Sequence, residues 1–151
     1  KIFSFANADN DGAVDFDYLN KVWTDDLALV IPFYDSFIYN NNTKLSNCIP
    51  DFNKIKPSFF IERNNLPLDS MVESLVWKYT ERSKKYPVYL AKSIYYKNKE
   101  DYKALQTYKI LCNRSFGRSA SLSSPNLNHF GSNEFCLESY KENVNNPFTA
   151  H

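Results

Sequence analysis

The chain has only three glycines among its 151 residues, and this scarcity restricts its fold more than any other feature. Glycine adopts positive φ angles at little cost, so the tight turns of β-hairpins often depend on it. A turn-rich sandwich or barrel is therefore disfavoured, and helices are favoured. The same scarcity excludes a glycine-rich loop that would bind phosphate.

The length and the apolar content predict a single domain. With 43% hydrophobic residues the chain can bury a core, and no linker, repeat or low-complexity tract divides it. We expect one compact domain over residues 1–151 that is mostly α-helical. Segments 35–66 and 113–136 are expected to be irregular, because they are rich in polar residues and prolines or serines, and the C-terminus at 143–151 is expected to fray.

The clearest element is a helix over about residues 69–85, and a second helical pattern covers about 15–30 and ends before Pro32. In the first helix, apolar residues recur at helical spacing on one face. The residues expected to be buried are Val72, Leu75, Val76 and Tyr79. The residues expected to be exposed are Glu73, Lys78 and Arg82.

The segment 88–112 is compatible with two structures. Its alanine, leucine, lysine and glutamine residues favour two helices, the first running from Pro87 to about residue 97 and the second starting at Asp101. Alternatively, Val88–Tyr96 and Tyr102–Cys112 form a β-hairpin, which would make the fold α+β. We favour the helices, because alanine, leucine, lysine and glutamine are good helix formers.

An acidic stretch near the start of the chain resembles the calcium loop of the EF-hand family over about twelve residues. Alternate oxygen-bearing residues and a glycine at the sharp turn, Gly12, match the arrangement that a hard cation needs. Tyr18 stands where that family has a bidentate glutamate. The resemblance implies a calcium site with ligands from Asn7, Asp9, Asp11, the carbonyl of Ala13, and Asp15.

Calcium is the only cofactor that the residues suggest, and the same stretch has a simpler interpretation. Asn-Asp-Gly is ordinary turn chemistry, so the segment can also be an Asx-rich turn without a metal. The absence of a twelfth-position carboxylate predicts weak calcium affinity, in the range of extracellular modules.

The cysteines and the apolar runs bear on the compartment. Cys112 and Cys136 flank a serine-rich segment, and we expect a disulfide between them with Cys48 left free. A disulfide is typical of a secreted or periplasmic protein. No apolar run is long enough to span a bilayer, because Pro32 interrupts the longest one.

The charges are divided unevenly along the chain. Residues 1–75 carry 6 basic and 11 acidic groups, and residues 76–151 carry 12 basic and 6 acidic groups, so the net charge is only +1. The basic stretch 78–118 also holds seven tyrosines, which together could bind and stack nucleic acid. The overall pI of about 7.8 does not favour that function.

No catalytic motif is present, which favours a non-enzymatic role. We expect a secreted or periplasmic protein-binding domain, such as an inhibitor, an immunity-type protein or an accessory surface factor, because aromatic residues make up 17% of the chain and anchor many interfaces. The alternative is a small nuclease or toxin-like hydrolase in which His129 acts as a general base beside Arg114 and Arg118.

Overall fold

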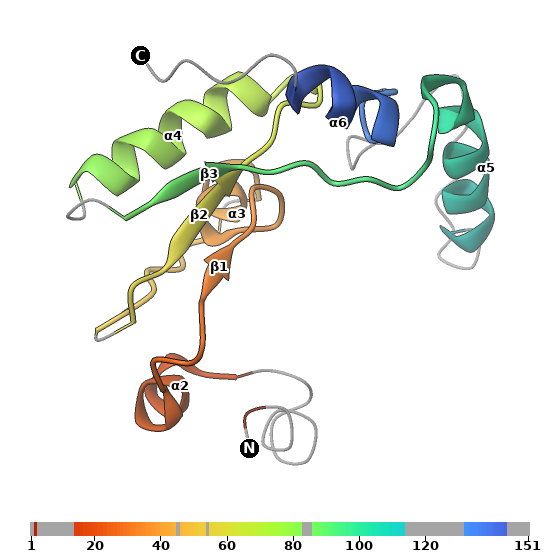
Figure 1. Ribbon diagram of the computed structural model, residues 1–151. Coiled ribbons are helices and arrows are strands. Elements are labelled where there is room, and N and C mark those ends of the chain that lie inside the picture. The colour runs from red at the N-terminus through yellow and green to blue at the C-terminus, as the bar shows by residue number, and fades with distance from the viewer. Residues whose placement is uncertain are drawn as a thin grey trace. The chain divides into compact units, whose positions relative to one another are not determined.

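The computed structural model describes Ile2 and residues 14–44, 46–53, 55–82, 86–113 and 132–144. Figure 1 shows the elements in chain order. They are α2 (Phe16–Val22), β1 (Val30–Ile31), α3 (Phe37–Thr43), β2 (Ser58–Ile61), α4 (Asp69–Arg82), β3 (Val88–Leu90), the 3₁₀ helix η1 (Lys99–Asp101), α5 (Tyr102–Asn113) and α6 (Leu137–Val144).

The fold class is α+β. The three strands form a small parallel sheet in the order β1-β2-β3, with Val30 opposite Ser58 and Ile31 opposite Phe59 in the β1–β2 pair. Parallel neighbours need a crossover connection, and α4 supplies the one between β2 and β3. The expectation of a mostly α-helical chain is therefore too simple, whereas its α+β alternative gives the right class.

The contacts divide the chain into two compact units. Unit 1 comprises Lys1–Ile61 and Val72–Tyr89, and unit 2 comprises Glu62–Met71 and Leu90–His151. The chain thus passes from unit 1 to unit 2 at the end of β2 and again within β3. That both units fold together as one domain over residues 1–151, which the length of the chain suggests, stays a prediction.

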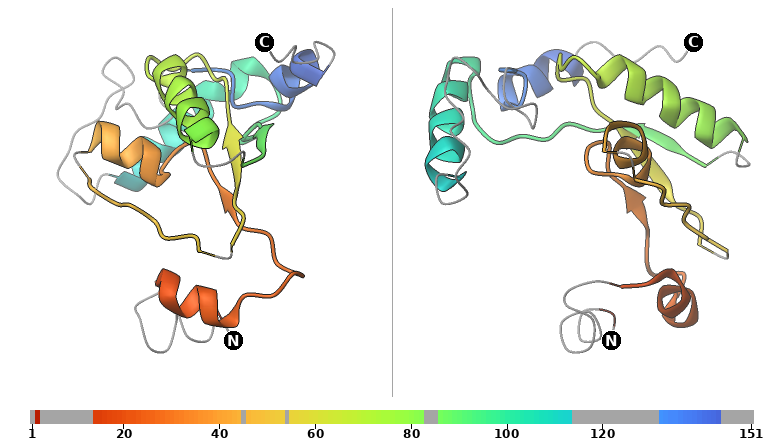
Figure 2. Two further views of the ribbon diagram at one scale, coloured as in Figure 1. Left: turned by 90° about the vertical axis from the view of Figure 1, so that its left-hand side faces the viewer. Right: turned by 180° about the vertical axis from the view of Figure 1, so that it is seen from behind.

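Unit 1 has an aromatic core. Phe59 of β2 is 1% exposed, and its ring lies 5.6 Å from that of Tyr79 on α4 and 5.8 Å from that of Tyr86. Phe37 of α3 contacts the same group, with its ring centroid 5.2 Å from Tyr79. Such tilted and edge-on pairs add to the stability that burial alone provides. Figure 2 shows α4 lying along the strands that it covers.

The amphipathic pattern of α4 is confirmed in part. Val72 and Val76 are buried at 0% and 2% exposure, whereas Lys78 and Arg82 are exposed. Leu75, Tyr79 and Glu73 are intermediate. The described helix ends at Arg82, close to the expected limit, and residues 83–85 lie outside the described ranges.

The earlier helix, α2, is shorter than its apolar pattern predicts. It begins after Asp15, whose carboxylate accepts the backbone N–H of Tyr18 at 2.6 Å and so acts as the N-cap. It ends at Val22, because Trp23 adopts an extended conformation. The irregular segment 35–66 contains only short elements, as expected, namely α3 and β2.

Segment 88–112 combines parts of both expected structures. Val88–Leu90 is a strand, so the first expected helix is wrong, and the backbone N–H of Phe59 donates to the carbonyl of Pro87 next to it. The second expected helix is confirmed as α5, which follows η1. The alternative hairpin is wrong in detail, because β3 neighbours β2 instead of the segment after it.

Candidate functional site

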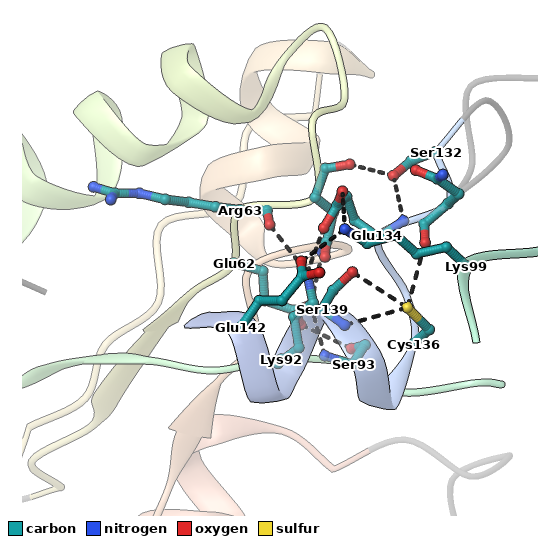
Figure 3. A network of polar contacts seen from close by, with 12 residues as sticks. Glu62, Arg63, Lys92, Ser93, Lys99, Ser132, Glu134, Cys136, Ser139 and Glu142 are labelled. Carbon is teal, nitrogen blue, oxygen red and sulfur yellow. Dashed lines mark hydrogen bonds and ion pairs between the residues drawn. The ribbon is translucent and has the colours of Figure 1, made fainter. Parts of the chain in front are cut away.

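A network of buried polar side chains lies within unit 2, and Figure 3 shows it from close by. It joins three segments that are distant in sequence, 62–69, 92–99 and 132–142. Glu62 directly follows β2, and Lys92 closely follows β3. Residues that follow the carboxyl ends of parallel strands form ligand sites in many α/β proteins, which makes this network a candidate functional site.

Glu62 is the central acceptor of the network and is only 7% exposed. One carboxylate oxygen accepts the Ser93 backbone N–H at 2.9 Å and the Asn64 side-chain amide at 2.9 Å, and the other accepts the Ser93 hydroxyl at 2.8 Å. A buried carboxylate is costly unless its oxygens accept hydrogen bonds, and here three donors meet that requirement. Glu62 therefore fastens the segment after β3 to the segment after β2.

Asp69 closes the loop between β2 and α4. As the first residue of α4, it accepts the backbone N–H of Asn64 at 2.8 Å and that of Leu66 at 3.1 Å on one carboxylate oxygen. Asn65 between them adopts a left-handed conformation with φ of 57°. A carboxylate is also favoured at this end of a helix by the dipole.

Lys92 contributes the buried positive charge. Its side chain is 6% exposed, and its Nζ donates to the carbonyl of Arg63 at 3.2 Å and lies 3.8 Å from a carboxylate oxygen of Glu134. Desolvation lowers the pKa of Lys92, and the negative charges of Glu134 and Glu62 act in the opposite direction. The other oxygen of Glu134 lies 3.9 Å from Nζ of Lys99, so Glu134 lies between two ammonium groups.

Cys136 and Ser139 form a smaller buried pair beside these charges. Both are 0% exposed, with their Sγ and Oγ atoms 3.2 Å apart. The Cys136 sulfur also accepts the backbone N–H of Ser139, so the thiol takes the capping role at the start of α6. Ser132, which precedes this pair in the chain, donates its hydroxyl to the carbonyl of Asn64.

The network continues to the base of α5. The backbone N–H of Lys99 donates to Glu138 at 2.9 Å, and its Nζ donates to Glu142 at 2.7 Å, which raises the pKa of Lys99. Asn98 and Asp101 form a capping box around η1, which contacts α5. The start of α5 is therefore held by ionic and hydrogen-bonded contacts to α6.

The carboxylates, amine and thiol of this network are engaged with one another and with the backbone. Such an arrangement fixes the path of the chain, and its groups have little freedom to bind and turn over a substrate. We therefore interpret the network as the framework of unit 2, which supports an exposed surface.

That surface is the exposed face of α5. Tyr108 and Leu111 are 64% and 55% exposed, and Ala104 is exposed one turn before Tyr108. We call these three residues the α5 strip. Positions i, i+4 and i+7 share one face of a helix, so the α5 strip is a continuous apolar line. Lys103 and Thr107 border it, and α5 contains no acidic residue.

The opposite face of α5 is turned toward the rest of unit 2. Gln106 is 8% exposed, and Leu105 is intermediate. Lys109 lies on this side as well, with its Nζ 5.3 Å from the ring centroid of Tyr95, and desolvation lowers its pKa. The helix therefore directs its exposed large apolar side chains away from the face that packs.

The residues expected to bind calcium are mostly outside the described ranges. This holds for Asn7, Asp9, Asp11 and Ala13, so the calcium site stays a prediction. The remaining one, Asp15, is the N-cap of α2. Within the described residues, no group of three or more His, Cys, Asp or Glu side chains is placed to hold a metal ion.

The residues expected in a hydrolase, His129, Arg114 and Arg118, also lie outside the described ranges. Two tyrosines of the basic segment 78–118, Tyr79 and Tyr86, pack in the aromatic core of unit 1. Tyr108 belongs to unit 2 and is exposed.

The expected disulfide between Cys112 and Cys136 is not formed. Cys136 carries a free thiol that is buried among the polar groups described above. Cys48, expected to be free, is free and exposed. The side-chain amide of Asn41 holds the backbone of Cys48 through two hydrogen bonds, of 2.7 Å to its carbonyl and 3.0 Å from its N–H.

The network residues were not singled out from the sequence, although a signal existed. Glu62 follows the apolar run Phe59-Phe60-Ile61, and Lys92 follows Leu90-Ala91. A charged residue at the end of an apolar strand is a candidate for a buried, paired charge. The partner Glu134 has no comparable signal, because its contact depends on the tertiary fold.

Comparison of the chain with models of known protein families, with curated proteins and with solved structures gives no match. In the described part of the chain, none of the helices combines the length and apolar character needed to span a bilayer.

Proposed function

We propose that the protein is a secreted or periplasmic protein-binding domain without enzymatic activity, in the class of inhibitors, immunity-type proteins and accessory surface factors. The observation that carries this proposal is the α5 strip. A helix that presents apolar anchors at i, i+4 and i+7 matches the pattern by which amphipathic helices enter the grooves of partner proteins.

The side chains of the α5 strip suit this role. Tyrosine is enriched among the residues that dominate binding energy, because its ring offers a large apolar area and its hydroxyl a hydrogen bond. Of the two large apolar side chains of α5 described as exposed, Tyr108 has the higher exposed fraction. The network supports this role because it fixes the start of α5. A binding face is more effective on an element whose position is fixed before the partner binds.

The capture of a partner from the native source tests the proposal. We expect the wild-type chain to retain a specific protein that the Tyr108→Ser/Leu111→Ser variant loses. The matched control is Ile49→Ser, which removes an 84% exposed apolar side chain from unit 1 and should leave capture unchanged. Equal capture by all three proteins would overturn the assignment of binding to α5.

The compartment is tested through Cys48. In an oxidising compartment an exposed single thiol forms a mixed or intermolecular disulfide. We therefore expect the native protein outside the cytoplasm, with Cys48 capped or cross-linked. Recovery from the cytoplasmic fraction with Cys48 reduced would refute secretion and leave the binding proposal intact.

A further inference from the structure

We draw no further inference here: the strongest candidate, the buried side-chain cluster of Lys92, Glu134, Cys136 and Ser139 in unit 2, belongs to the network already described, and its polar groups are engaged with one another and with the backbone.

Discussion

The carboxylate of Glu62 accepts two hydrogen bonds from Ser93, which lies 31 residues later in the sequence. The backbone N–H of Ser93 donates at 2.9 Å and its hydroxyl at 2.8 Å. This pair joins the segments that follow β2 and β3. Both residues belong to unit 2, so this pair is part of the framework of that unit.

Substitution of Glu62 by Gln should destabilise the fold. Gln has one acceptor oxygen in place of two and adds an amide that faces the donors of Ser93 and Asn64. We expect the free energy of unfolding to fall by about 2–3 kcal/mol, as when a buried charged acceptor leaves its donors unsatisfied. Urea unfolding measures it, with the exposed Glu81→Gln as a control that should change little. A Glu62→Gln chain as stable as this control would show that the three bonds do not hold the segments together.

The charges of Lys92 and Glu134 should prove coupled. Glu134→Ala leaves a buried ammonium without its nearest carboxylate and should cost about 3 kcal/mol, whereas Lys92→Met replaces the ammonium by an apolar chain of similar length and should change stability by less than about 1 kcal/mol. A double-mutant cycle measures the coupling, and the double variant should be more stable than Glu134→Ala alone. Strictly additive effects would mean that the 3.8 Å contact carries no energy.

Tyr96 should make stability depend on pH in the alkaline range. Desolvation, with the nearby Cys136 adding to it, raises the pKa of Tyr96 from 10.0 to about 12 in the folded chain. A phenol whose pKa rises on folding stabilises the native state fully below pH 10, and that contribution is lost as the pH rises through about 12. Unfolding at several alkaline pH values should therefore show a steeper loss for the wild type than for Tyr96→Phe. Parallel curves would place the phenol in a solvent-like environment.

The thiols should react at very different rates. Cys48 is exposed and Cys136 is buried at 0% exposure, so an alkylating reagent should label Cys48 in the native state and Cys136 only after unfolding. Mass mapping of labelled peptides checks this, and Cys48→Ser should remove that site's rapid labelling. Early labelling of Cys136 would contradict its place beside Ser139.

Local signals were sufficient where the structure depends on local contacts. Helix α4 could be predicted from its apolar spacing, because Val72 and Val76 recur at helical intervals and are buried on one face. Helix α5 could be predicted from the good helix formers that follow Asp101. Strand β3 was expected only in the alternative structure, which paired it with Tyr102–Cys112. Its pairing with β2 spans the whole of α4, and no property of residues 88–90 reveals that neighbour.

The candidate site also has a part that local sequence signals predict and a part that depends on tertiary contacts. The exposed face of α5 could have been found from the helical spacing of Ala104, Tyr108 and Leu111, but which face packs depends on Tyr95 and the rest of unit 2. The network could not have been assembled from the sequence, since Lys92 and Glu134 are 42 residues apart and meet only in the folded chain.

The most direct test of a binding role for α5 is the stability of the Tyr108→Ser/Leu111→Ser variant. If the strip is a recognition face, both side chains are mostly exposed and contribute little to folding, and the free energy of unfolding at low protein concentration should change by less than about 0.5 kcal/mol. If the strip instead covers the core, losing a large aromatic and a leucine should cost at least about 3 kcal/mol. A loss of that size would contradict the account, and unchanged stability together with lost capture would support it.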